Sequence, residues 1–333
     1  MKFGVLQFFS WKNRASTFSD IYASALDRIH VMDETGYDAV WLAEHHFSDY
    51  SVCPSVHIMG TWVASHTKRL RIGTAVSLAA FYHPLRLAEE VALLDVLSGG
   101  RVNWGAGRGF DKTEFNTFGV KPEESYARYR ENVEIVLAAW KNERITYSGE
   151  YHSFEGVEVL PKPLQDPHPP VWLAATSPAA VESAAKDGYS IMMDPHASHA
   201  DIAEKFALYA KTLEVNGYEG ADTRDIPVAR LLAVADTEEG ARTIAERGAG
   251  WLVDSYVNDS KFGGKTPAGM VDVRKEDPIA GYMRDRIIFG TPESVTEQVH
   301  RLREEIPMEY LLCAPLSPGS FDLFTEKVMP DFL

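Results

Sequence analysis

The chain has 333 residues, of which 45% are hydrophobic and 24% are charged, and its formal net charge is −15 at pH 7. This acidic balance argues against nucleic acid or an anionic membrane as a partner, because binding phosphate groups requires a basic surface. The only two cysteines, Cys53 and Cys313, exclude a disulfide framework and agree with a reducing compartment. We find no secretory signal and no run of about 18 apolar residues, so we expect a cytoplasmic protein without a membrane span.

Short apolar or β-branched runs alternate with amphipathic segments of helix length along the whole chain. The expected strands are Phe3–Phe8, Tyr37–Ala43, Leu70–Leu78, Val102–Ala106, Val171–Ala175, Tyr189–Met193, Pro227–Val234 and Glu309–Cys313. The expected helices are Phe18–Thr35, Pro54–Ser65, Pro84–Leu97, Glu123–Trp140, Pro178–Lys186, His199–Asn216, Glu238–Arg247 and Pro292–Glu304. Such alternation implies parallel strands joined by right-handed crossovers. About eight units without a composition break predict an α/β fold, a single (β/α)8 TIM barrel over residues 1–333, with a doubly wound sheet as the alternative.

Two segments interrupt this alternation and are expected as insertions at the C-terminal mouth of the barrel. Residues 143–170 alternate in polarity between turn signals, which predicts a small hairpin. Residues 251–286 contain "SKFGGKTPAG" and are either a lid or disordered. The "GGKT" of Gly263–Thr266 is not a P-loop, because Asp259 stands where its first glycine belongs and Pro267 blocks the helix that should follow.

Three residues that can carry chemistry, Glu44, His45 and His46, follow the second expected strand in "YDAVWLAEHHF". In a barrel, catalytic residues lie where the strands end at their C-terminal side. Adjacent strand residues point to opposite faces, so the two imidazoles do not readily chelate one metal, and no zinc-ligand spacing is present. Two interpretations remain: an imidazole that exchanges protons with a bound substrate or cofactor, or a histidine that is only hydrogen-bonded at the strand end.

Glycines recur at every second residue in "GGRVNWGAGRGFDKTEF", at Gly105, Gly107 and Gly109. If the strand geometry persists, all three face one way and leave a wall without side chains, which a flat group could approach. Turn glycines at a strand end are the alternative. The spacing differs from G-x-G-x-x-G, which argues against a dinucleotide fold. Arg108, between two of these glycines, suits a phosphate or another anion.

A second candidate for anion binding is the strand-to-helix turn in "VWLAATSPAAVESAA", at Thr176 and Ser177. The helix that starts at Pro178 exposes unpaired backbone N–H groups, which form a natural seat for phosphate. A simple serine N-cap is the alternative. His196 and His199 in "DPHASHAD" are either substrate-site candidates or ordinary loop and cap residues.

Several motifs together resemble the bacterial luciferase-like flavin-dependent monooxygenase family. They are, in the family's order, "YDAVWLAEHHF", "LRIGTAVSLAAFYHPLRLAEEVALLDVLSGGRVNWGAGRG", "DKTEFNTFG", "VWLAATSPAAVESAA" and "IIFGTPESVTEQV". The most specific block carries the pattern "HP.R.AEE...LD..S.GR". The resemblance implies a (β/α)8 barrel that holds reduced FMN at its C-terminal mouth. There oxygen would form a 4a-hydroperoxyflavin, which oxidises a small organic substrate.

The resemblance also assigns roles to particular residues. His45 matches a general base or hydrogen-bond partner near the reactive ring, and Glu44 matches the carboxylate that precedes it. A non-proline cis peptide is expected at Ala75–Val76, where it shapes the flavin seat. The expected cofactor-binding residues are Ala75, Val76, Gly107, Arg108, Thr176, Ser177 and, as a further phosphate contact, Arg128. No metal is expected.

One departure from the family pattern is the glycine at position 107, where luciferase proper has a reactive cysteine, so light emission is not expected. The chain has no evident nicotinamide motif, and we therefore expect a separate flavin reductase as partner. The family's usual assembly implies a homodimer. Two alternatives stay open: a deazaflavin-dependent hydride-transfer enzyme on the same fold, and a non-catalytic flavin-binding protein. The substrate is not determined, nor whether the oxidation is a hydroxylation, an aldehyde oxidation or a Baeyer–Villiger insertion.

Overall fold

The computed structural model describes residues 1–256 and 277–333. They form two compact units. Unit 1 comprises Met1–Leu6, Thr35–Asp38 and Leu173–Leu333, and unit 2 comprises Gln7–Glu34 and Ala39–Trp172. Among the helices that the structure describes, none is both long and apolar enough to span a membrane.

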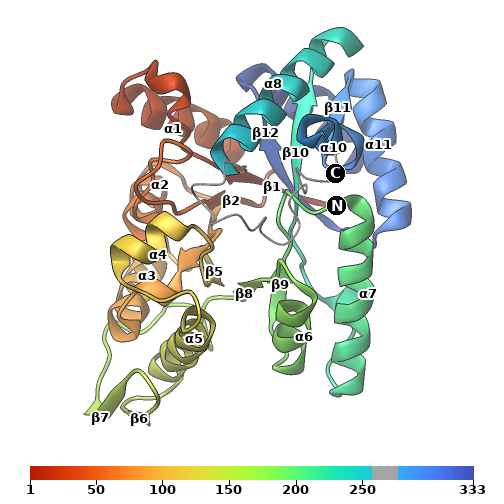
Figure 1. Cartoon of the computed structure of the whole chain (residues 1–333). Helices are drawn as coiled ribbons and strands as arrows, with labels where there is room; N and C mark the ends of the chain where they lie inside the picture. Colours follow the sequence, from red (N-terminus) through yellow and green to blue (C-terminus); the bar gives the residue numbers. More distant parts are fainter. Residues whose placement is uncertain (257–276) are drawn as a thin grey trace. The chain divides into compact units, whose positions relative to one another are not determined.

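Unit 2 contains a parallel sheet flanked by helices and a separate hairpin (Figure 1). Strand β3 lies between β2 and β5, and the short β4 pairs with β5. The strands are β2 Ala39–Leu42, β3 Arg71–Thr74, β4 Ser77–Leu78 and β5 Val102–Gly107; the helices are α1 Phe18–Glu34, α2 Val56–His66, α3 Pro84–Ser98, α4 Lys112–Phe118 and α5 Ser125–Lys141. The antiparallel strands β6 Ile145–Ser148 and β7 Ser153–Val157 confirm the hairpin predicted within residues 143–170.

Unit 1 contains a second group of parallel strands, in the order β11, β10, β12, β1. The strands are β1 Lys2–Gln7, β8 Val171–Ala174, β9 Ser190–Met192, β10 Val228–Val234, β11 Ile287–Gly290 and β12 Tyr310–Pro315, with β1 and β8 each continuing across a unit boundary of the chain. The helices are α6 Pro178–Lys186, α7 His199–Val215, α8 Glu238–Tyr256, α10 Pro278–Asp285, α11 Pro292–Glu305 and α12 Pro318–Leu323. A parallel bridge from Met193 to Val228 joins the end of β9 to β10.

Helix ends follow the capping residues that the sequence offers. The hydroxyl of Ser198 caps the backbone N–H of Asp201, whose carboxylate accepts from the N–H of Ser198 in return, so α7 starts with a capping box. Helix α3 begins at Pro84 and ends at Gly99, which has φ 71°. This left-handed backbone is the conformation that glycine adopts without steric cost, so the helix stops there.

The structure corrects four sequence predictions. The expected third strand is interrupted by residues 75–76 and forms β3 and β4. Helix α4 was expected as a loop, yet Asp111 caps it by accepting from the N–H of Thr113. Strand β11 was missed, because four apolar residues directly before a helix give no periodic pattern. Residues 251–256 and 278–285 are helical rather than irregular, and residues 257–276 of the predicted lid, with its "GGKT", lie outside the described residues.

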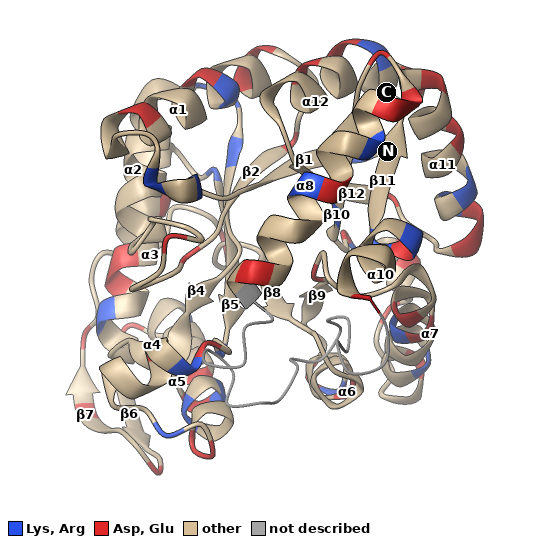
Figure 2. Cartoon of the chain, turned by 45° about the horizontal axis from the view of Figure 1, so that its top comes forward, with Lys and Arg blue, Asp and Glu red and all other residues tan. Residues whose placement is uncertain are grey.

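Charged residues lie mostly on the helices, whereas the strands carry few of them (Figure 2). Of the aromatic residues near the strand ends of unit 2, Trp41 and Trp104 are fully buried, whereas Phe8 and Phe81 are partly exposed. The ring of Trp41 meets the ring of Trp172 edge to face, with centroids 5.2 Å apart. Trp41 and Trp104 are therefore core residues.

Two residues of the family-like pattern "LD..S.GR" have structural roles. The fully buried carboxylate of Asp95 accepts from the backbone N–H groups of Leu164 and Gln165, at 2.8 and 2.9 Å. The guanidinium of Arg101 donates to carbonyl oxygens at the C-terminal end of α2, at 3.0 and 3.1 Å. Hydrogen bonds to charged groups each contribute about 1.5–3 kcal/mol, so this part of the pattern stabilises the fold.

Gly73 makes room for the core of unit 2. A Cβ atom at this position would lie 2.3 Å from the indole ring of Trp41. We expect Gly73→Ala to lower the free energy of unfolding by about 1–3 kcal/mol, because overpacking a fixed core forces side chains off their rotamers. Urea denaturation measures this change. Gly319→Ala, whose Cβ would meet no described atom within 4 Å, is the control, and an equal result for both variants would contradict the explanation.

Candidate active site

The carboxyl ends of three adjacent strands bring the candidate residues of unit 2 to one edge of its sheet. Leu42 pairs with Thr74 where β2 and β3 end, and β5 runs parallel beside them. Glu44, His45 and His46 follow β2, the peptide Ala75–Val76 follows β3, and Arg108 follows β5. The predicted placement at strand ends is therefore confirmed for these residues.

Glu44 is a buried carboxylate with both oxygens engaged. It is 2% exposed, its Oε1 lies 3.0 Å from Nε2 of His46, and its Oε2 accepts from the hydroxyl of Tyr82 at 3.0 Å. Burial and the neighbouring Glu44 carboxylate raise the pKa of Tyr82, so this phenol stays a neutral donor. Glu44 thus orients the second histidine of the pair.

Glu114, on helix α4, is the partner of the first histidine. This side chain is 1% exposed, and its Oε1 accepts from the backbone N–H of His46 at 2.9 Å and lies 3.4 Å from Nδ1 of His45. Sequence reasoning did not select Glu114. The only sequence signal for Glu114 was its position inside the motif "DKTEF". From the sequence alone, this position is equally typical of a glutamate on a solvent-facing helix surface.

Aromatic rings surround the imidazole of His45. Its centroid lies 6.5 Å from that of Phe8, in a stacked arrangement, and 5.1 and 6.0 Å from those of Tyr50 and Phe110, edge to face. The side chain is 12% exposed. An imidazole held by a carboxylate in largely apolar surroundings is suited to take up and release a proton beside a bound molecule.

The two histidines lie next to different carboxylates. His45 approaches Glu114, whereas His46 approaches Glu44. Within residues 1–256 and 277–333, no group of three or more His, Cys, Asp or Glu side chains is arranged to hold a metal ion. The geometry is therefore that of two carboxylate–imidazole pairs.

The peptide Ala75–Val76 is cis, as the family resemblance implied. The N–H of Ala75 donates to the carbonyl of Leu42 at 2.7 Å, which ties this peptide to the end of β2. The next residue, Ser77, has its hydroxyl 2.9 Å from Nε2 of His57, and Nδ1 of the same ring lies 3.0 Å from Glu90. A backbone hydrogen bond thus holds the first residue of the cis peptide, and side-chain hydrogen bonds hold the residue that follows the cis peptide.

The wall of three glycines is corrected to two. Gly105 and Gly107 lie two residues apart within β5, so they share one face of the strand. Gly109 lies beyond the strand end with φ 82°, and a Cβ there would lie 3.2 Å from the ring of Phe81. Gly109 therefore serves a turn, for which a left-handed backbone is needed.

Two arginines of unit 2 offer positive charge. Arg108 is exposed and makes no hydrogen bond or ion pair with the described part of the chain, while partial burial lowers its pKa. Arg128 lies over the ring of Tyr151 at 4.5 Å and 4.0 Å from a carboxylate oxygen of Glu124, and its buried Nε has no partner among the described residues. Donors without a protein partner fit the anionic end of a cofactor.

Ser177 belongs to unit 1, where its hydroxyl accepts from the N–H of Ala180 at 3.3 Å and caps α6. The simple N-cap interpretation therefore holds for its side chain. Thr176 beside it is exposed. The N-terminus of α6 still presents backbone N–H groups, which can bind an anion at the same time.

Residues 1–308 match the family model described as luciferase-like monooxygenase. The chain therefore belongs to the luciferase-like monooxygenase family. Among its relatives is the oxygenase component of flavin-dependent trigonelline monooxygenase from Acinetobacter baylyi, which is 28% identical over 248 residues, or 74% of this chain and 68% of the relative.

Solved structures share the fold of this chain. The monooxygenase RslO1 from Streptomyces bottropensis is 26% identical, covers 100% of both chains and has a TM-score of 0.87. The oxygenating constituent of 3,6-diketocamphane monooxygenase from Pseudomonas putida, in complex with FMN, has a TM-score of 0.82 at 18% identity, over 100% of this chain and 99% of the other. An F420-dependent secondary alcohol dehydrogenase reaches 0.79 at 18% identity, with the same coverage. The predicted TIM-barrel fold is thereby confirmed.

We expect Glu114→Ala to lower the free energy of unfolding by about 1–3 kcal/mol, because the N–H of His46 then loses its acceptor in a buried place. Chemical denaturation monitored by tryptophan fluorescence measures the loss. Glu123→Ala removes an exposed carboxylate from the same part of the chain and is the control. If both variants unfold at the same denaturant concentration, Glu114 does not hold the loop.

Proposed function

We propose that the protein is a flavin-dependent monooxygenase that uses reduced FMN and molecular oxygen to oxidise a small organic substrate. The observation that carries this proposal is the convergence at one sheet edge of His45, the cis peptide Ala75–Val76 and Arg108, whose guanidinium has no hydrogen bond or ion pair with the described residues. The flavin dependence of the relative from Acinetobacter baylyi and the FMN in the Pseudomonas putida structure support the choice of cofactor.

The residues present fit a flavin with a phosphate tail. Arg108 makes no hydrogen bond or ion pair with the described residues, and Nε of Arg128 has no partner among them, so both can donate to the phosphate. In unit 1, the start of α6 at Thr176 and Ser177 is a separate candidate for a phosphate contact. The backbone at Ala75, Val76 and Gly107 supplies a surface with few side-chain atoms for the ring. When bound, reduced FMN supplies the electrons that activate oxygen.

The protein's own contribution is proton handling and water exclusion. His45, oriented by Glu114, holds or transfers the proton that the oxidation requires. The rings of Phe8, Tyr50 and Phe110 keep water from this imidazole. Glu44 acts through His46 and Tyr82 as a positioning residue, since both of its oxygens are engaged by them.

The proposal includes partners and excludes light emission. A separate reductase supplies the reduced flavin, in keeping with the relative's description as an oxygenase component. The assembly is a homodimer. Gly107 lacks the thiol that luciferase proper carries at this position, so the reaction yields oxidised product without useful luminescence.

The main alternative is hydride transfer with a deazaflavin coenzyme, favoured by the fold similarity to the F420-dependent dehydrogenase. A non-catalytic flavin-binding protein is the other. Equilibrium dialysis against reduced FMN and reduced F420, with oxygen uptake recorded, separates the three. We expect retention of FMN and oxygen consumption coupled to product during a mass-spectrometric substrate screen. Retention of F420 alone, or FMN binding with no oxygen use above the free-flavin rate, would refute the monooxygenase.

Replacing His45 by alanine should lower the turnover number by roughly two to four powers of ten, because the proton-transfer group is lost. The dissociation constant for FMN should change little. Stopped-flow kinetics at saturating flavin measures the first quantity, and flavin fluorescence quenching the second. His66→Ala, at the exposed end of α2, is the control. An unchanged turnover number would remove His45 from the mechanism.

Arg108→Ala should weaken FMN binding by roughly tenfold to a hundredfold, because a hydrogen bond to a charged group is lost. Binding of riboflavin, which lacks the phosphate, should stay the same, so the preference for FMN over riboflavin shrinks. Arg144→Ala, which removes an exposed arginine from the hairpin, should keep that preference. Equal weakening for both ligands would show that Arg108 does not contact the phosphate.

A further inference from the structure

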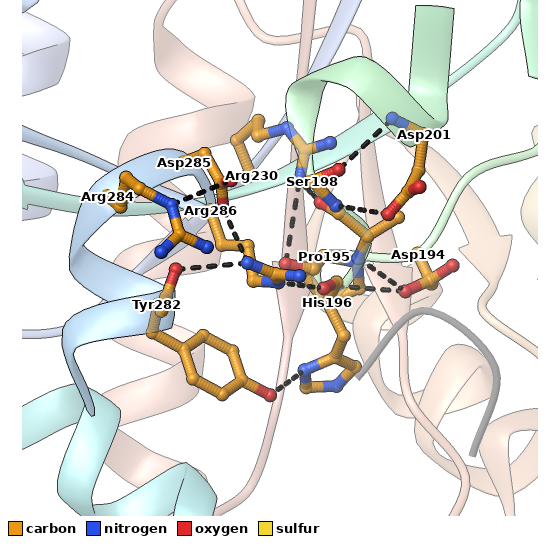
Figure 3. A network of polar contacts seen from close by, with 12 residues as sticks. Asp194, Pro195, His196, Ser198, Asp201, Arg230, Tyr282, Arg284, Asp285 and Arg286 are labelled. Atoms are coloured by element: carbon orange, nitrogen blue, oxygen red, sulfur yellow. Dashed lines mark hydrogen bonds and ion pairs between the residues drawn. The ribbon is translucent and has the colours of Figure 1, made fainter. Parts of the chain in front are cut away.

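Unit 1 contains a cluster of buried cations that the proposed function does not use; Figure 3 shows two of them, Arg230 and Arg286. Arg230 lies on β10, Lys205 on α7, and Arg286 directly before β11. Their side chains are 0%, 5% and 6% exposed, in that order. Charged residues are almost never buried to this degree unless they are paired, so each needs a partner.

Part of this need is met by the loop that follows β9. Nη1 of Arg230 donates to the carbonyl of Ala197 at 2.9 Å, and Nε of Arg286 donates to the carbonyl of His196 at 2.6 Å (Figure 3). Arg286 is also paired with the carboxylate of Asp285. These hydrogen bonds to the loop account for the burial of Arg286, but they satisfy only one nitrogen of Arg230.

The remaining nitrogens of Arg230 face no acceptor. Its buried Nε and Nη2 have no hydrogen-bond partner in the described ranges of the chain. These two atoms lie on the same edge of the planar guanidinium, where their parallel N–H groups match the two oxygens of a carboxylate. A single unpaired donor can hold only one oxygen, whereas the two parallel N–H groups of this edge form a fork that can hold both oxygens of one carboxylate.

Lys205 is a second cation of the cluster that forms an ion pair but no hydrogen bond with the described residues. Its Nζ is buried without a hydrogen bond to any described residue, and the nearest carboxylate oxygen, Oδ2 of Asp194, lies 3.6 Å away. This distance exceeds that of a hydrogen bond, and the same oxygen also lacks a partner in the described chain. The other oxygen of Asp194, Oδ1, accepts from the backbone N–H groups of His196 and Ala197, and Arg230 donates to the carbonyl of Ala197, so both cations have a partner at this loop.

The carboxylates of the cluster lie toward solvent. The side chain of Asp194 is 16% exposed and that of Asp285 is 29% exposed. Asp201 is exposed and engaged in the capping box of α7. Among the described residues of the cluster, the charged side chains that are more than nine-tenths buried, Arg230, Lys205 and Arg286, are all cations.

The neighbouring His199 carries no charge at neutral pH. Burial, followed by the charges of Arg230 and Arg286, lowers the pKa of His199 to about 4, so the ring is neutral at pH 7. Its buried Nε2 has no partner among the residues described. A neutral imidazole can accept or donate a hydrogen bond to a ligand without repelling an anion.

We propose that Arg230 and Lys205 form a binding site for the carboxylate group of a small organic ligand. The two ligand oxygens accept from Nε and Nη2 of Arg230, and Lys205 donates to one of them. Oδ2 of Asp194 accepts a hydrogen bond from a hydroxyl or amino group of the same ligand. The fork matches the oxygens of either group, but a carboxylate is favoured over a phosphate dianion, because a second negative charge costs more to desolvate. The site stands independently of the proposed flavin chemistry.

Titration of the purified full-length protein with sodium acetate and sodium benzoate tests the site, with sodium chloride and sodium phosphate at equal ionic strength as comparisons. We expect saturable binding of at least one carboxylate by calorimetry, with one site per chain and a matching rise in Tm, whereas chloride has no such effect. Absence of saturable carboxylate binding overturns the proposal, as does binding of phosphate alone.

Substitutions at the two residues of the proposed site, together with one control, test where the carboxylate binds. Lys205→Met should weaken carboxylate binding at least about tenfold, whereas Lys211→Met, the same change at an exposed position of α7, should not. Arg230→Lys keeps the charge and removes the fork, so it should abolish the preference for carboxylate over chloride. Equal affinity of the two lysine variants overturns the assignment. If an Arg230 variant does not fold, the wild-type titration and the lysine pair still decide.

Discussion

Buried carboxylates that accept backbone N–H groups are the interaction on which the loops of unit 2 depend. Asp95 holds residues 164–165, Glu131 holds residues 150–152, and Glu114 holds the loop that follows β2. A backbone N–H that is buried away from water must find an acceptor, and loops cannot supply one through regular pairing. Each carboxylate satisfies this need and simultaneously fixes the conformation of its loop.

At the candidate site, buried carboxylates also position side chains that can take part in a reaction. The oxygen of Glu114 that holds the N–H of His46 also approaches the ring of His45, so loop conformation and imidazole orientation depend on one atom. Glu44 fixes the second ring and Tyr82 in the same way. A preorganised imidazole does not need to be reoriented during a reaction, which is the contribution that the proposed monooxygenase requires from its protein.

Prediction from sequence succeeded where the signal is local. Helix α6 was predicted with the bounds it has, because Ser177 and Pro178 mark its start chemically. Strand β11 and helix α4 were missed, because a four-residue strand and a seven-residue helix are too short for a periodic pattern. The prediction of a wall of three glycines was wrong at Gly109 for a related reason. The residue at which a strand ends depends on the neighbouring strands of the sheet.

The sequence by itself determined the family, the alternation of strands and helices, and the position of Glu44, His45 and His46 after a strand. These follow from local motifs and from a periodicity that each segment carries alone. Only the tertiary structure decided which carboxylate meets which imidazole, and that one edge of Arg230 is buried without an acceptor among the described residues. Such pairings join residues far apart in the chain, and their distances depend on how several elements pack, which no local pattern encodes.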